Sequence, residues 1–189
     1  MDAGRQTPDA ARARRLGRIK LLVLAAFFTL PVAAGYLAYS WWTPAQGSNY
    51  GELLSPRPLN DATIAALKGK WVLVQFDSGA CDADCVRKHY FMRQVRKSQG
   101  KDQYRVERLW LVTDAAAPSS DLLEAISGTR IERAASRSLA EQFPAQGALA
   151  HHIYLVDPLG NLMMRFPRDP DPRQVINDLQ RLLKTSRIG

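Results

Sequence analysis

The sequence predicts an α/β domain with a mixed sheet flanked by helices, carried behind a single N-terminal transmembrane helix. The first supporting feature is a run of uncharged, mostly apolar residues at 21–42. The second is an alternation of apolar strand patterns and helical patterns after residue 61, in the order β-α-β-α-β-β-α. The third is a cysteine pair, Cys81 and Cys85, at the junction of the first of these strands with the next helix.

The uncharged run at 21–42 is long enough to cross a hydrocarbon core of roughly 30 Å as a helix. Aromatic residues typical of a membrane border gather toward its far end: Tyr36, Tyr39, Trp41 and Trp42. Residues 1–20 hold six basic and two acidic side chains, which favours a cytoplasmic tail. We expect a single-pass anchor in a bacterial-type inner (plasma) membrane, with the C-terminal domain in the periplasm. The alternative is a signal peptide cleaved near residues 32–34, which leaves the domain on the same side.

Residues 43–61 are expected to form a linker, because they contain three prolines and two glycines and show little periodicity. The segments "NYGELL" and "PRPL" within this stretch are either plain linker or a short strip that docks against the domain. The globular domain is then expected to cover residues 62–189.

The formal net charge of +8 does not indicate a nucleic-acid partner. Much of the excess lies in residues 1–20, and the remaining bases are interspersed with acids, whereas nucleic-acid binding requires a clustered basic face. The densest basic run of the domain, "RKHYFMRQVRK" at 87–97, is most simply an exposed helix face. Docking of an acidic partner protein is the alternative for this run.

Four segments of the domain have strand patterns: 71–76, 104–113, 152–157 and 162–166. Helical patterns occupy 85–97, 121–127, 139–143 and the closing segment 169–187. The turn "PLGN" at 158–161 joins the last two strands into a hairpin. This order supports a mixed sheet with helices on its faces.

The cysteine pair has the pattern Cys-x-x-x-Cys, which allows a disulfide staple, a thiol–disulfide switch or part of a metal site. A disulfide between helical i and i+4 positions is geometrically feasible. It closes only a very short loop, so it restrains the unfolded chain little and a purely structural role is poorly motivated. Asp82 and Asp84 oppose a strongly activated thiolate and favour a nearby cation.

Two thiolates suit Cu(I), and an added imidazole suits copper or zinc. His89 lies four residues after Cys85 and shares its helical face, so it is one candidate for a third ligand. The simpler interpretation of His89 is a solvated side chain on an exposed helix.

Three segments resemble the Sco/SenC group of thioredoxin-like, copper-handling proteins of cytochrome c oxidase assembly. They are "GKWVLVQFDSGACDADC" (69–85), "LWLVTD" (109–114) and "HHIYLVDPLGNLMMRF" (151–166). The resemblance covers roughly residues 68–185. It implies a thioredoxin-like fold, copper as cofactor and the copper-bearing subunit of cytochrome c oxidase as partner.

The resemblance also implies a ligand histidine just before the hairpin, beside the two cysteines. On a strand, residues of equal parity share a face, so His151 keeps the face on which the family carries its ligand. The predicted metal site is therefore Cys81, Cys85 and His151, with His152 as the second choice.

Three classes of function follow. The preferred one is a membrane-anchored thiol- or copper-handling accessory factor for oxidase assembly, in which Cys81 and Cys85 are the redox pair. The second is a general extracytoplasmic thiol–disulfide oxidoreductase, which would make the protein an enzyme. The third is a non-catalytic thioredoxin-like accessory subunit.

Overall fold

The computed structural model describes residues 8–41, 49–133, 137–186 and 188. It divides the chain into two compact units, residues 1–47 and 48–189. The first unit contains one long helix, α1 (Pro8–Trp41), with Pro31 inside it. Its stretch Arg15–Tyr39 is long and apolar enough to cross a membrane.

The second unit is built on one six-stranded mixed sheet with the strand order β1-β6-β5-β2-β3-β4. The strands are β1 (Glu52–Pro58), β2 (Trp71–Asp77), β3 (Val106–Val112), β4 (Arg130–Arg133), β5 (Ile153–Val156) and β6 (Asn161–Phe166). Strands β2, β3 and β4 run parallel, whereas β5 and β6 are antiparallel to their neighbours, as is β1. The predicted mixed sheet is confirmed.

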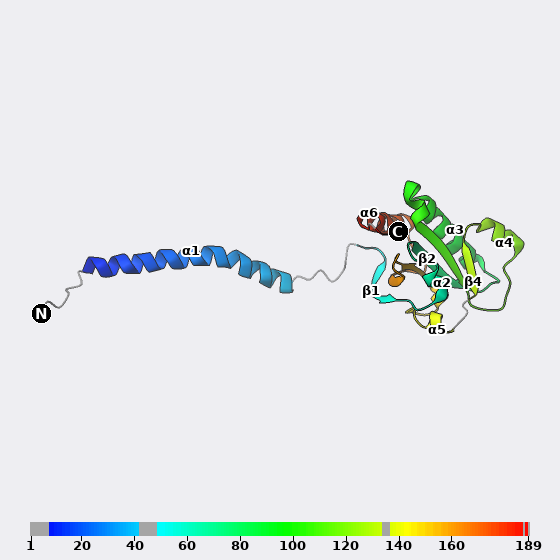
Figure 1. The fold of residues 1–189 in the computed structure, drawn as a ribbon, viewed down its shortest axis with the longest axis horizontal. Coiled ribbons are helices and arrows are strands. Elements are labelled where there is room, and N and C mark those ends of the chain that lie inside the picture. Colours follow the sequence, from blue (N-terminus) through cyan, green and yellow to red (C-terminus); the bar gives the residue numbers. More distant parts are fainter. Residues whose placement is uncertain (1–7, 42–48, 134–136, 187, 189) are drawn as a thin grey trace. The chain divides into compact units, whose positions relative to one another are not determined.

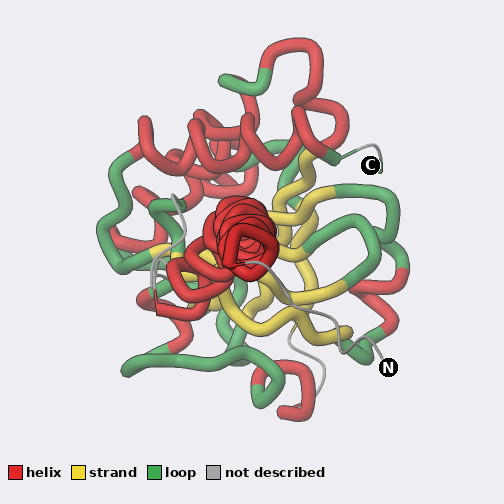
Figure 2. The backbone as a smooth tube through the Cα atoms, turned by 90° about the vertical axis from the view of Figure 1, so that its left-hand side faces the viewer, coloured by secondary structure: helices red, strands yellow, loops and turns green. Residues whose placement is uncertain are grey.

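Helices lie on both sides of this sheet (Figures 1 and 2). The longer helices are α3 (Ala83–Lys97) and α6 (Pro172–Thr185). The shorter ones are α2 (Ala62–Ala65), η1 (Gly100–Arg105), α4 (Ser120–Ala125), α5 (Arg137–Ala140) and η2 (Leu149–His151). One core cluster joins α3 and α6 to the sheet through residues such as Leu73, Met92 and Leu179. The opposite cluster contains Val74, Phe76 and Leu139.

Strand β2 is central because its side chains, apart from Gln75, are apolar on both faces. From Trp71 to Phe76 every residue is buried, and successive side chains of a strand point to opposite faces. Leu73 therefore enters the α3/α6 cluster while Val74 enters the opposite one. A strand buried on both faces reads as a continuous apolar run, which is why this element was predictable.

The stretch expected to be linker contributes a strand to the domain. Residues 52–58 form β1, which pairs with β6 at the edge of the sheet. Just before it, the backbone N–H groups of Tyr50 and Gly51 donate to Oδ2 of Asp178 on α6, at 2.9 and 2.8 Å. The second half of the expected linker is therefore part of the folded unit.

Candidate redox and metal site

The cysteine pair lies in the connection between β2 and α3. Cys81 and Cys85 are joined by a disulfide bond, with their Cα atoms 5.1 Å apart. The side chain of Asp82 caps α3 by accepting from the N–H of Cys85 at 2.9 Å. Cys81 has a φ of 43°, a left-handed conformation that costs free energy in a residue other than glycine and is found at functional sites. The bend at Cys81 and the first turn of α3, which contains Cys85, hold the two sulfurs together.

The loop before Cys81 is held against the loop that follows β3. The N–H of Gly79 donates to Oδ1 of Asp114 at 2.9 Å. Hydrogen bonds from the Ser78 side chain and from the N–H groups of Gly79 and Ala116 lower the pKa of Asp114. A Cβ atom on Gly79 would lie 2.0 Å from the backbone oxygen of Ala116. The cysteine loop therefore needs glycine at position 79.

Replacing Gly79 with alanine is expected to lower the free energy of unfolding of the domain by about 1–3 kcal/mol, the usual cost of overpacking a site that cannot relax freely. Urea unfolding of residues 48–189 measures this loss. Ala80→Ser, a change at the exposed neighbouring residue, serves as the control and should leave stability within about 0.5 kcal/mol of the starting value. An equal effect of both substitutions would contradict the proposed close contact with Ala116.

The disulfide is surrounded by apolar side chains. Cys81 is 8% exposed and Cys85 is fully buried. They pack in one cluster with residues of β3, of α4 and of the C-terminal cap of α4: Trp110, Val112, Leu122 and Ile126. Such surroundings exclude water from most of the disulfide and leave access mainly at Cys81.

His89 lies beneath this disulfide, on the same face of α3 as Cys85. One sulfur of each cysteine and a ring nitrogen of His89 all lie within 4.8 Å of one another. The His89 side chain is buried, and neither ring nitrogen has a hydrogen-bond partner among the described residues. Its ring packs edge-on against Trp110, with the ring centroids 4.6 Å apart. Buried polar groups are nearly always hydrogen-bonded, so an unpartnered imidazole facing two sulfurs calls for an explanation.

The pKa of His89 falls from 6.5 to about 4, mainly because burial penalises the charged imidazolium and also because Arg108 and Lys88 carry like charges nearby. The ring is therefore neutral at pH 7, which is the form that binds metals. The interpretation of His89 as a solvated side chain is wrong. The spacing of positions 81, 85 and 89, four residues apart each time, was the sequence signal for this arrangement.

A buried ion pair supports the site from the other side. Nζ of Lys88 lies 3.0 Å from Oδ2 of Asp77, the last residue of β2. Lys88 also donates to the backbone oxygen of Ala150 in η2. Gln75 donates to the same Asp77 oxygen at 3.2 Å. Lys88 thereby ties α3 to the segment that carries His151.

His151 and His152 are not on a strand, since β5 begins only at Ile153. His151 ends η2 and is half-buried, lining a small hollow of about 120 Å³ together with Asp82, Asp84 and other residues. His152 is buried, and its two ring nitrogens bond to the backbone oxygens of Phe166 and Gln146 at 3.0 and 3.1 Å. Within the described part of the chain, the group of donors close enough to hold a metal contains His89 rather than either of these histidines. His151 as a ligand stays a prediction.

The two acids between the cysteines already have partners. Asp82 caps α3, as described above. Asp84 forms ion pairs with Arg87 and Arg168, both at 3.2 Å. The pKa of Asp84 is lowered, first by the hydrogen bond from Arg168 and then by Arg87. Asp82 is therefore engaged with the start of α3 and Asp84 with two arginines, so neither acid is directed at a metal cation as expected.

A helix able to span a membrane and a thioredoxin-like domain with a Cys-x-x-x-Cys pair define the class as membrane-anchored thioredoxin-like proteins. Residues 71–186, more than half of the chain, match the family described as transmembrane-like, thioredoxin-like, C-terminal domain. The chain belongs to this family. Among curated proteins, none matches it in sequence.

Solved structures share the fold of the second unit. Yeast Sco1 with copper bound is 16% identical, with a TM-score of 0.52 over 75% of this chain and 96% of that one. A DsbF homologue from Corynebacterium diphtheriae is 13% identical, with a TM-score of 0.52 over 73% and 96%. Copper-bound ScoI from Bradyrhizobium japonicum is 20% identical, with a TM-score of 0.49 over 69% and 98%. The thioredoxin-like fold and its likeness to Sco proteins, both expected from the motifs, are confirmed.

Proposed function

We propose that this protein is a membrane-anchored thiol- and copper-handling accessory factor, with copper as its cargo. The observation that carries the proposal is the group formed by Cys81, Cys85 and His89, whose donor atoms lie within 4.8 Å of one another in an apolar cluster. Donor atoms bonded to one ion at roughly 2.0–2.3 Å lie within about 4.6 Å of each other. Only a small movement is needed to bring these three donors around a metal.

The chemistry of the donors favours Cu(I). Thiolates are soft ligands that select Cu(I), and imidazole is compatible with them. The neutral, unpartnered ring of His89 requires neither the loss of a proton nor the loss of a hydrogen bond before it binds a metal. His89 is for these reasons our choice for the third ligand, and His151, which lines a hollow together with Asp82, is the alternative.

The disulfide must be reduced before the cysteines can hold a metal. A partner dithiol attacks one sulfur of the Cys81–Cys85 bond, forms a mixed disulfide and then resolves it, so the partner is oxidised and two thiols are left here. Cys81 is the more exposed of the two residues, at 8% against 0% for Cys85, and we assign its sulfur as the one attacked. Binding of Cu(I) then releases the thiol protons. In the reverse exchange, the Cys81–Cys85 disulfide would oxidise the dithiol of a client protein. The same two cysteines would thus serve both thiol exchange and copper binding.

We further propose that the domain lies on the periplasmic side of an inner membrane and that its client is the copper-bearing subunit of a cytochrome c oxidase. The basic residues before the apolar helix support this orientation, and the motifs shared with the Sco/SenC group support this client. Copper bound to yeast Sco1, which has the same fold, supports the cargo. The likeness to a DsbF homologue and the disulfide itself support a general thiol–disulfide oxidoreductase as the second candidate.

Competition for Cu(I) against a chromophoric chelator tests the proposal on the full chain in detergent micelles, reduced and kept free of oxygen. We expect one Cu(I) per chain. Cys81→Ser should weaken binding by more than the roughly 10–100-fold that loss of a supporting residue costs a metal site. His89→Phe, which keeps a ring of similar shape, should weaken binding at least about tenfold.

His151→Ala is the matched control for the third ligand and should leave the affinity within about threefold. If His151→Ala weakens binding and His89→Phe does not, the third ligand is His151. If the unsubstituted protein binds no Cu(I) but exchanges disulfides with small dithiols, the oxidoreductase function replaces the copper function.

A further inference from the structure

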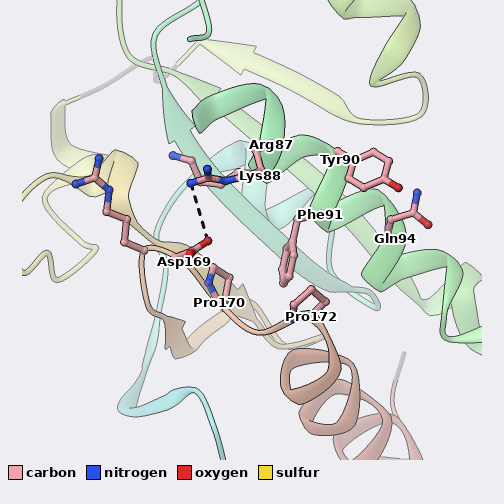
Figure 3. A pocket seen from close by; sticks show the side chains of 9 residues that line it. Arg87, Lys88, Tyr90, Phe91, Gln94, Asp169, Pro170 and Pro172 are labelled. Atoms are coloured by element: carbon pink, nitrogen blue, oxygen red, sulfur yellow. Dashed lines mark ion pairs between the residues drawn. The ribbon is translucent and has the colours of Figure 1, made fainter. Parts of the chain in front are cut away.

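A groove of about 320 Å³ lies between α3 and the segment that joins β6 to α6 (Figure 3). Tyr90 and Phe91 line it from α3, while Pro170 and Pro172 line it from the opposite segment. In Figure 3, Phe91 and Pro172 face each other across the groove. We propose that this groove docks an extended, acidic segment of a partner protein, which inserts one large apolar side chain between α3 and α6.

The walls of the groove suit a large apolar side chain. Rings of tyrosine, phenylalanine and proline offer flat apolar surfaces, and aromatic anchors in such pockets supply much of the energy of protein interfaces. Tyr90 is 63% exposed and Val86, one turn earlier on α3, is 43% exposed. The apolar surface therefore continues along α3 beyond the groove, as an extended partner segment requires.

The charge at one end of the groove favours a carboxylate. Arg87 and Arg168 are 58% and 61% exposed, and both pair with the single carboxylate of Asp84. Asp169 approaches Arg87 only at 3.9 Å, with its side chain 87% exposed. A guanidinium has five N–H donors and binds carboxylates in a bidentate manner. The two arginines therefore retain donors for an acidic residue that flanks the inserted side chain.

The groove is continuous with the surroundings of the cysteine pair. Arg87, Lys88 and Arg168 line both the groove and the small hollow, whose other lining residues include Asp77, Asp82, Asp84 and His151. Because the hollow itself carries three carboxylates, the acidic flank of a bound segment would stop at the exposed sides of Arg87 and Arg168, at the border between groove and hollow. The groove gives the basic run at 87–97 a role as part of a docking surface. This inference does not depend on whether the cysteines handle copper or only exchange disulfides.

Three acetylated heptapeptides test the docking surface on the full chain in detergent micelles, with the disulfide intact and no copper present. The first has a central phenylalanine flanked by aspartates, the second replaces phenylalanine by alanine, and the third replaces the aspartates by lysines. Isothermal titration calorimetry should show that the first peptide binds at least about tenfold more tightly than either of the others. Equal binding of the first two, or of the first and third, would overturn the apolar or the acidic part of the proposal.

Two substitutions locate the binding. Arg168→Glu should weaken binding of the first peptide about tenfold or more, and Gln94→Trp, which fills the groove from α3, should also weaken it. Arg57→Glu makes the same charge change on β1, outside the groove, and should leave binding unchanged. Circular dichroism checks that each variant is folded.

Other occupants of the groove would appear as different outcomes. The proposal would be overturned if the first peptide did not bind at millimolar concentration. It would also be overturned if, instead of peptide binding, Arg168→Glu abolished self-association of the chain or its binding to anionic vesicles. Because copper is absent throughout, loss of docking and loss of Cu(I) binding are read in separate experiments.

Discussion

Lys88→Met is expected to lower the free energy of unfolding of residues 48–189 by about 3–5 kcal/mol, the usual cost of breaking a buried ion pair. Only 9% of the Lys88 side chain and 13% of the Asp77 side chain are exposed. Removing the ammonium group leaves the carboxylate of Asp77 nearly buried with only neutral donors, which are Gln75 and the N–H of Ser78. Urea unfolding of the oxidised domain measures the loss.

Two further variants separate charge pairing from simple truncation. Asp77→Asn combined with Lys88→Met removes both charges and should recover a large part of the lost stability, because no unpaired carboxylate remains buried. Lys97→Met removes an exposed lysine of the same helix and should change stability by less than about 1 kcal/mol. If the double variant is no more stable than Lys88→Met, the destabilisation comes from lost packing rather than from the unpaired charge.

The elements that sequence predicted well are those with a strong period. The apolar run of β2 predicts a buried strand, and the amphipathic pattern of α6 predicts a helix with one buried face. The two edge strands were missed for different reasons. In β1, Pro56 and Pro58 argue against a strand, yet prolines are tolerated at a sheet edge. Strand β4 contains only four residues, too few to show a clear pattern.

The site shows where reasoning from sequence ends. The spacing of Cys85 and His89 correctly predicted a shared helical face, whereas Cys81 lies before α3 and comes beside them through its left-handed backbone. The basic residues around His89 suggested an exposed helix face, so its burial was not predicted. The burial of His89 depends on Trp110 of β3, which is distant in sequence and comes into contact only through the parallel pairing of β2 with β3. The parity argument for His151 assumed a strand that reaches residue 151, whereas that segment is the short helix η2.

Acidification should destabilise the domain through His89, with the effect confined to the interval between pH 6.5 and about 4. The pKa of His89 is about 4 in the folded protein and 6.5 ordinarily. As the pH falls through 6.5, the unfolded chain binds a proton on this histidine, but the folded protein does not until about pH 4. The contribution of neutral His89 is therefore fully present above pH 6.5 and is lost on the way down, by about 3 kcal/mol in all.

The measurement compares the pH dependence of urea unfolding in three proteins, because carboxylates also affect stability in this interval. The unsubstituted domain and His151→Ala should lose stability in parallel between about pH 7 and pH 4.5. His89→Phe cannot bind the proton and should lose about 2–3 kcal/mol less. Parallel curves for all three proteins would show that the folded state accepts the proton readily, and hence that His89 is not held neutral by burial. Because His89 stays neutral down to about pH 4, protons do not compete with Cu(I) for its ring nitrogen above that pH. The pH dependence of Cu(I) binding there should come from the two thiols.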